Sequence, residues 1–352
     1  MHRLGSLIIT IVVIPSLVSA WYSVKNPKRN NILLQKYRPS LGFSQSALAM
    51  VSSISLDDSP LQWQDFLNSV ESSDGSTSLL WDQVQKEANH AVSMEPAVGS
   101  QLYQGILSHT SLLEAIVTIV AHEIETELMP ATVFKNLFME SLTKKDESAI
   151  HRDVASVAMC TSDGSIMTAV LFHKGLHALV CHRVGHRLWE AGRTGLAYYL
   201  QSTVSRKFSA DIHPAAQIGS GIYLVIGGGI VIGETAVVGN DTCILQGVTL
   251  GGTGKETGDR HPKVGNGVIL HPGCSVLGNI VVGDGAIVSP KSIVTKAVPP
   301  LARVRGVPAR IESYREATEE EFNRSDLCRT LAYRYKDVWE KIVKERHHNA
   351  GT

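Results

Sequence analysis

The chain has 352 residues, which is enough for two or three domains with a sizeable core. Its 33 lysines and arginines balance its 33 aspartates and glutamates, so its charge gives no reason to expect a nucleic-acid partner. The five cysteines include no closely spaced pair, which favours a reducing compartment and argues against a disulfide framework or a cysteine metal site.

The first 60 residues have the composition of a targeting leader. Residues 1–20 are predicted to be a signal peptide, because Arg3 precedes an apolar run, Leu7 to Ile14, that is too short to span a bilayer and is followed by small residues. Residues 21–60 resemble a transit peptide, since their first part carries basic residues and serines but no acidic residue before Asp57. A disordered basic tail is the alternative for this second segment.

The two segments together resemble the bipartite leaders that address proteins to plastids enclosed by extra membranes. We therefore expect a plastid location, with the secretory pathway or ER, the mitochondrion and the cytosol as alternatives. The mature form is expected to have no membrane segment.

Residues 61–209 are predicted to form a helical domain, because apolar residues recur there at intervals of three and four. Four histidines in this region also follow helical spacing: His173, His177, His182 and His186. No carboxylate or cysteine has a matching offset, so we expect structural histidines and no metal.

Residues 210–311 are dominated by a period of six. One register comprises Ile232, Val238, Ile244 and Leu250, and a second comprises Val264, Leu270, Val276, Val282, Val288 and Val294. A strand alternates at two and a helix returns at three or four, so this period fits neither. It predicts a parallel β-helix in which each aliphatic residue stacks on its equivalents in neighbouring coils.

A polar insertion separates the two registers. The step from Leu250 to Val264 is longer than two repeats, and the residues between them are rich in glycine and charge. A solenoid accommodates surplus residues by extruding a loop, and such loops often bind ligands.

Six motifs along the chain resemble serine O-acetyltransferase, the enzyme that makes O-acetylserine from L-serine and acetyl-CoA in cysteine biosynthesis. They are Lys174–Leu179, Arg183–Trp189, Asp211–Ala216, Gly233–Ala236, Val248–Lys255 and Gly258–Lys263. The resemblance implies an α+β fold, with an all-helical N-terminal domain, a left-handed parallel β-helix and a helical C-terminal tail. It also implies a homotrimer or a dimer of trimers that holds acetyl-CoA between neighbouring coils.

The resemblance also assigns site residues. Acetyl-CoA is expected to bind at Gly251, Gly252, Thr253, Gly254 and Lys255. Arg260 would hold the substrate carboxylate, because its planar fork grips a carboxylate with two hydrogen bonds, and His261 would line the serine pocket. Asp211 corresponds to the aspartate that orients the family's catalytic histidine. We expect these groups to converge in a crevice between adjacent protomers.

The general base itself is missing. The family's catalytic aspartate–histidine pair corresponds to Val225 and Ile226, and neither side chain can accept a proton. A further family carboxylate is also absent, its nearest counterparts being residues 159–162. We expect impaired turnover, with His261 or His271 as candidate substitute bases. A sequence error within residues 225–229 is the alternative.

Residues 312–352 are predicted to form an amphipathic helical tail. The resemblance implies O-acetylserine sulfhydrylase as a partner, but family members that dock into it often end in isoleucine, whereas this sequence ends at Thr352, so docking stays open. Two other functions also remain open: a non-catalytic regulatory or scaffold paralogue of serine acetyltransferase, and an acetyltransferase for a different acceptor.

Overall fold

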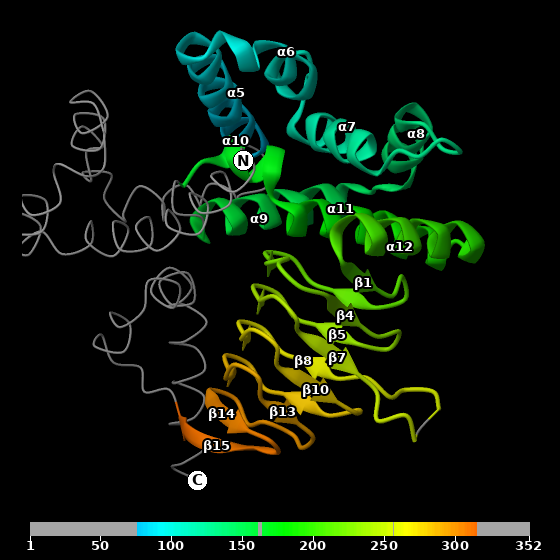
Figure 1. Ribbon diagram of the computed structural model, residues 1–352, viewed down its shortest axis with the longest axis vertical. Helices are drawn as coiled ribbons and strands as arrows, with labels where there is room; N and C mark the ends of the chain where they lie inside the picture. The colour runs from blue at the N-terminus through cyan, green and yellow to red at the C-terminus, as the bar shows by residue number, and fades with distance from the viewer. Residues whose placement is uncertain (1–75, 161–163, 256, 315–352) are drawn as a thin grey trace, which may run out of the picture. The chain divides into compact units, whose positions relative to one another are not determined.

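A computed structural model describes residues 76–160, 164–255 and 257–314 of the chain. These residues form a helical part followed by a parallel β-helix (Figure 1), which confirms the predicted fold class. The predicted signal peptide, transit segment and amphipathic tail fall outside the described residues, apart from Glu312–Tyr314. These three residues belong to a β-strand, Ala309–Tyr314, so the prediction that the helical tail begins at residue 312 was wrong. All described residues belong to one compact unit.

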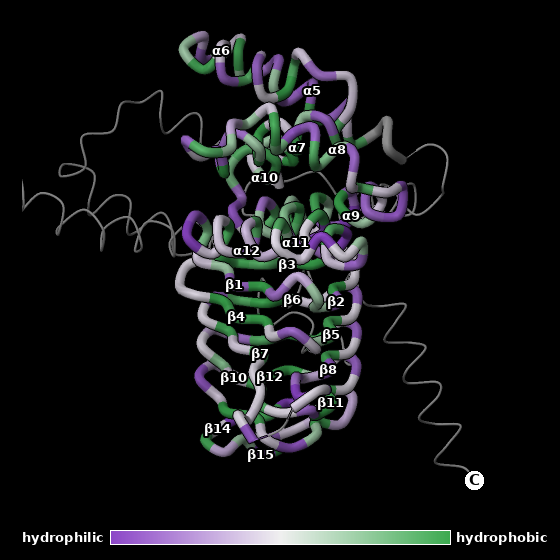
Figure 2. The backbone as a smooth tube through the Cα atoms, turned by 90° about the vertical axis from the view of Figure 1, so that its right-hand side faces the viewer, coloured by the Kyte–Doolittle hydropathy of each residue, from purple (hydrophilic) through white to green (hydrophobic). Residues whose placement is uncertain are grey.

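The helical part has two layers (Figure 1). Its α-helices are α5 (Ser76–Met94), α6 (Gly99–Leu102), α7 (Leu112–Ile124), α8 (Ala131–Ser141), α9 (Lys144–Cys160), α10 (Ile166–Phe172), α11 (Lys174–Glu190) and α12 (Thr194–Phe208), with a 3₁₀ turn at Pro96–Val98 and a π turn at Tyr103–Leu107. The lower layer of α9, α11 and α12 covers the first coil of the β-helix, and the other helices pack above it (Figure 2). In the described part of the chain, no single helix has the length and apolarity to span a bilayer, although the sharply bent pair Pro96–Leu107 and Leu112–Ile124 meets both conditions together.

The β-helix has three sheets. Sheet A contains β1 (Ala210–Ile212), β4 (Ile230–Ile232), β7 (Thr249–Gly251), β10 (Ser275–Leu277) and β13 (Ile293–Val294). Sheet B contains β2 (Gln217–Ile218), β5 (Val237–Val238), β8 (Lys263–Val264) and β11 (Val281–Val282). Sheet C contains β3 (Tyr223–Leu224), β6 (Cys243–Ile244), β9 (Ile269–Leu270), β12 (Ile287–Val288), β14 (Ala302–Gly306) and β15 (Ala309–Tyr314). Every pair is parallel except β14–β15, which closes the sheet as an antiparallel hairpin.

The strand register confirms the period-six prediction. In sheet A, Ile232 pairs with Leu250, which pairs with Val276, and Val276 pairs with Val294. Sheets B and C stack the other aliphatic positions in the same way, and these side chains are buried. Within each sheet, the two sequence registers therefore continue the same stack of buried side chains. The surplus residues leave the β-helix as a loop between β7 and β8.

A buried ion pair joins the helical part to the first coil. Asp153 of α9 binds Arg183 of α11, and its second carboxylate oxygen accepts the backbone N–H of Ile222 at 2.8 Å. Arg183 also donates to the carbonyl of Gly219 at 2.9 Å. The same four groups therefore fix two helices and the turn that leads into β3.

The helices approach the coil closely at Gly175. A Cβ at this position would lie 1.7 Å from the carbonyl oxygen of Leu224 in β3. Just before it, His173 caps α11 by accepting the Leu176 N–H, and its ring stacks on Tyr223 with centroids 5.7 Å apart. No larger residue fits at Gly175 unless α11 moves away from the β-helix.

We predict that Gly175→Ala lowers the free energy of unfolding by about 1–3 kcal/mol or more, because the new methyl group overpacks a rigid backbone contact. The matched control is Gly195→Ala in α12, where an added Cβ would meet nothing within 4 Å. There the higher helix propensity of alanine should leave stability unchanged or raise it by up to ~1 kcal/mol. Thermal and denaturant unfolding measure both, and equal stabilities would contradict the close contact.

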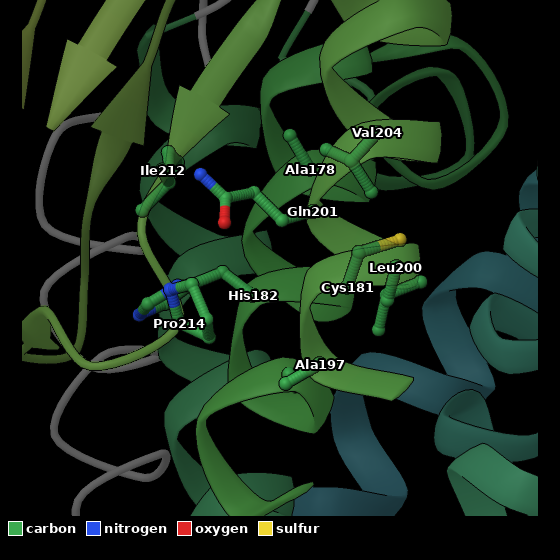
Figure 3. A pocket seen from close by; sticks show the side chains of 10 residues that line it. Ala178, Cys181, His182, Ala197, Leu200, Gln201, Val204, Ile212 and Pro214 are labelled. Carbon is green, nitrogen blue, oxygen red and sulfur yellow. The ribbon is translucent and has the colours of Figure 1, made fainter. Parts of the chain in front are cut away.

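His182 lies at the same junction without a complete set of partners. Its Nδ1 is buried and has no hydrogen-bond partner in the described structure. It lines a cavity of about 10 Å³ with Gln201, Ile212 and Pro214 (Figure 3), which is about the space of one water molecule. Burial, with smaller contributions from His186 and Arg183, lowers the pKa of His182 to about 3.

We predict an acid-sensitive junction. In the unfolded chain His182 takes up a proton below its ordinary pKa of about 6.5, whereas the folded chain resists protonation down to about 3. The unfolded state therefore binds more protons in this window, so stability is lost as pH falls, by at most ~1.4 kcal/mol per pH unit for this group. His182→Gln should flatten the fall in melting temperature between pH 7 and pH 5. The exposed His90 supplies the control, His90→Gln, and parallel curves for His182→Gln and the unmodified chain would contradict the assignment.

Candidate active site

Asp211 is an exposed side chain of β1 between two buried neighbours, Ala210 and Ile212. Gln201, in the middle of α12, donates a hydrogen bond to its carboxylate at 2.6 Å. Gln201 could not be recognised from the sequence, because it is only one polar residue within a helix. The helix therefore sets the direction of the Asp211 carboxylate.

Val225 and Ile226 follow β3 and lie in apolar surroundings. Val225 packs, with Cys160 and Tyr223, against an outward-facing cluster on sheet C, and Ile226 packs against the main core. The buried members of that cluster are Cys243, Leu245, Ile269 and Ile287. The position that corresponds to the family's aspartate is thus uncharged, partly exposed and packed against apolar side chains.

His271 shares a column with Val225 on sheet C, two coils away. Leu245 follows β6 between them, as the register of β6 with β3 and β9 shows. Two strand spacings amount to about 10 Å. Burial and the charge of Arg303 lower the pKa of His271. Within one chain, His271 is therefore too distant to take the place of a base at Ile226.

The turn Gly251–Lys255 leaves β7 beside the returning end of its own loop. A Cβ at Gly252 would lie 3.4 Å from the carbonyl oxygen of Arg260 and 3.5 Å from its Cγ, so the turn and Arg260 are in close contact. Gly254 has a φ of 74°, a left-handed conformation that glycine adopts without strain. The structure thus brings the predicted cofactor turn next to the predicted carboxylate-binding arginine.

Arg260 and His261 fold back onto the turn between β4 and β5. The Arg260 guanidinium donates to the Glu234 carboxylate at 2.7 Å and to the carbonyl of Gly258 at 3.0 Å. The His261 ring lies over Gly233, where a Cβ would be 2.1 Å from its Cδ2 and Nε2 atoms. In the sequence, Glu234 was recognised only as part of the motif Gly233–Ala236, and its pairing with Arg260 was not predicted.

His213 completes this charged corner. Its Nδ1 accepts the Ala215 N–H at 3.1 Å, and its ring packs edge-on against Trp189 at 5.1 Å. Burial lowers its pKa, and the charges of Glu234 and Asp211 oppose the shift. Burial and Arg260 likewise lower the pKa of His261, so both imidazoles favour the neutral form. The hydrogen bond from Arg260 lowers the pKa of Glu234 and keeps it ionised.

One chain holds only part of the predicted crevice together. Ile226 precedes β4, whereas Glu234 and the loop end at Arg260 lie just after this three-residue strand. Convergence of the two regions between adjacent protomers stays a prediction. Among the described residues, no group of three or more His, Cys, Asp or Glu side chains could hold a metal ion.

Comparisons with known proteins match both parts of the chain. Residues 80–181 match the family described as serine acetyltransferase, N-terminal. Residues 261–296 match the bacterial transferase hexapeptide family, which has six repeats.

Individual relatives extend over most of the described residues. The chain is 45% identical over 238 residues to serine acetyltransferase 2 of Arabidopsis thaliana, covering 66% of this chain and 73% of that protein. It is 42% identical over 236 residues to serine acetyltransferase of Escherichia coli K12, covering 66% of this chain and 86% of that protein.

Solved structures agree. A serine acetyltransferase from Brucella abortus matches with a TM-score of 0.66 and 40% identity, covering 68% of this chain and 99% of that one. A soybean serine acetyltransferase complexed with serine matches with a TM-score of 0.65 and 40% identity, covering 67% of this chain and 98% of that one.

Proposed function

Because the chain belongs to the serine acetyltransferase family, we propose that it is a serine O-acetyltransferase, which transfers the acetyl group of acetyl-CoA to L-serine and yields O-acetyl-L-serine and CoA. The observation that carries the proposal is the corner where Arg260 and His261 lie on Glu234 and Thr235 beside the Gly251–Lys255 turn. The proposed pathway is cysteine biosynthesis, and the proposed location is the plastid.

The Arg260–Glu234 pair matches the two charges of an amino acid. Arg260 keeps N–H groups beyond those that bind Glu234 and Gly258, and these can grip the serine carboxylate. The ionised Glu234 carboxylate beside it is a partner for the serine ammonium group. The recognition of both charges would place the serine hydroxyl at a defined distance from this corner.

Acetyl-CoA fits the turn that follows β7. The backbone N–H groups of Gly251–Gly254 and the ammonium of Lys255 supply donors and a positive charge for an anionic ligand. Acetyl-CoA would supply the thioester that serine attacks, and this turn would hold it against Arg260.

The proton of the serine hydroxyl has no acceptor at residues 225–226. Loss of a general base costs ~10²–10⁴ in rate, while positioning of the two substrates still contributes. We therefore propose slow turnover in a homotrimer or a dimer of trimers, where neighbouring chains bring the two regions together. We propose O-acetylserine sulfhydrylase as a further partner.

The apolar surroundings of Val225 favour a second candidate, a regulatory or scaffold subunit in mixed trimers with active paralogues. It would bind serine or acetyl-CoA without forming product. An acceptor screen separates both candidates from an acetyltransferase that uses a different hydroxyl or amine.

The decisive prediction restores the missing pair. Val225→Asp combined with Ile226→His should raise kcat with L-serine by ~10²–10⁴, because it restores the missing base and the carboxylate beside it. Release of the CoA thiol and mass spectrometry of O-acetylserine measure the rate. The control makes the same changes at exposed positions, Val281→Asp with Ile311→His, which are 55% and 48% exposed. An unmodified chain that already turns over as fast as the double variant would refute the impairment.

Arg260→Lys tests the carboxylate site separately. Lysine keeps the charge but loses the planar fork, so we expect the Kd for L-serine to rise about tenfold, equivalent to about 1.4 kcal/mol. The Kd for acetyl-CoA should differ from that of the unmodified chain by no more than about twofold. Calorimetry on the assembled protein measures both Kd values. An unchanged affinity for serine would show that Arg260 does not bind the serine carboxylate.

A further inference from the structure

Thr235 makes an unusual number of contacts with the end of the extruded loop. Its Oγ1 accepts the backbone N–H groups of Arg260 and His261, each at 3.1 Å. Its own N–H donates to Nδ1 of His261 at 3.1 Å, and its carbonyl accepts the Lys263 ammonium at 2.6 Å. A single residue in the turn after β4 thus holds both residues assigned to serine binding.

These bonds determine which ring nitrogen of His261 carries the proton. A backbone N–H can only donate, so Nδ1 of His261 must offer its lone pair to Thr235. The Thr235 hydroxyl, 3.0 Å from the same Nδ1, already uses both lone pairs for Arg260 and His261 N–H groups. Its proton can go either to Nδ1 or to the Asp259 carboxylate, so the Thr235 backbone N–H alone sets the tautomer. The neutral ring must carry its proton on Nε2.

The other edge of the ring carries Nε2. Nε2 has no hydrogen-bond partner among the described residues, and its edge rests on Gly233, where any side chain would displace it. With its proton on Nε2, the ring can donate a hydrogen bond but has no lone pair there to take a proton.

We propose that Thr235 is a positioning residue that fixes His261 as the Nε2–H tautomer, so that His261 donates a hydrogen bond to an oxygen of the acceptor and does not act as the substitute base. The assignment of the ligand as an amino-acid acceptor rests on the proposed function. The tautomer rests only on contacts within the chain. To act as a base at Nε2, His261 would have to move its proton to Nδ1, where it would face the backbone N–H of Thr235.

The test compares Thr235→Val, which has nearly the same shape but no hydroxyl, with Thr235→Ser, which keeps it. In ¹⁵N-histidine NMR of the whole protein, assigned with His261→Gln, the unmodified chain and Thr235→Ser should show Nε2 protonated. Thr235→Val keeps the backbone N–H that donates to Nδ1 but removes the acceptor of the two loop N–H groups. It should keep Nε2 protonated and show a serine Kd that is raised about tenfold, or about 1.4 kcal/mol, because Arg260 and His261 lose their anchor, while acetyl-CoA affinity stays unchanged.

Thr242→Val is the matched control. Thr242 is also a turn threonine of the β-helix, but its hydroxyl bonds only to backbone carbonyls, including Gly239 at 3.1 Å and Gly265 at 3.2 Å. A purely structural effect would appear in both valine variants, and it would overturn the proposal. So would a proton on Nδ1 in the unmodified chain. Because the NMR measurement needs no substrate, a correct tautomer with no serine binding would reject only the proposed function.

Discussion

The buried Asp153–Arg183 pair is the interaction on which the arrangement of the two parts depends. A parallel β-helix leaves unpaired backbone groups at its first coil, and such an edge must be covered. Here Asp153 also accepts the backbone N–H of Ile222, and Arg183 also donates to the carbonyl of Gly219, so two backbone groups of that coil are hydrogen-bonded. Removing either charged partner would leave the other buried and unpaired, at a cost of about 3–5 kcal/mol. The pair therefore stabilises the contact between the helices and the first coil only while both charged partners are present.

The fold could be predicted because its signal is periodic and local. Each aliphatic position of the six-residue repeat has one structural role, so Leu250 and Val276 stack whichever residues lie between them. The loop between β7 and β8 could be predicted as an insertion, since its length breaks the period. The direction of this loop could not be predicted, because its return to Glu234 and Thr235 depends on single hydrogen bonds between residues about 25 positions apart.

The same contrast holds for the site. Family resemblance predicted the roles of Asp211, Arg260 and His261 from motifs, but no motif indicates that Gln201 holds Asp211 or that Thr235 holds the His261 ring. These partners are ordinary polar residues in the middle of a helix and in a turn. Their importance follows only from which donors and acceptors they meet, and this is a property of the folded chain.

The proposed function separates two requirements of acetyl transfer, recognition of the acceptor and removal of its proton. Arg260 and Glu234, which we propose to hold serine's two charges, are hydrogen-bonded to each other, and this bond lowers the pKa of Glu234. At the position of the proposed proton acceptor stands Ile226, and the neighbouring Val225 packs against an apolar cluster on sheet C. We therefore propose that recognition and proton transfer depend on different coil corners, so that a chain can keep the first while losing the second.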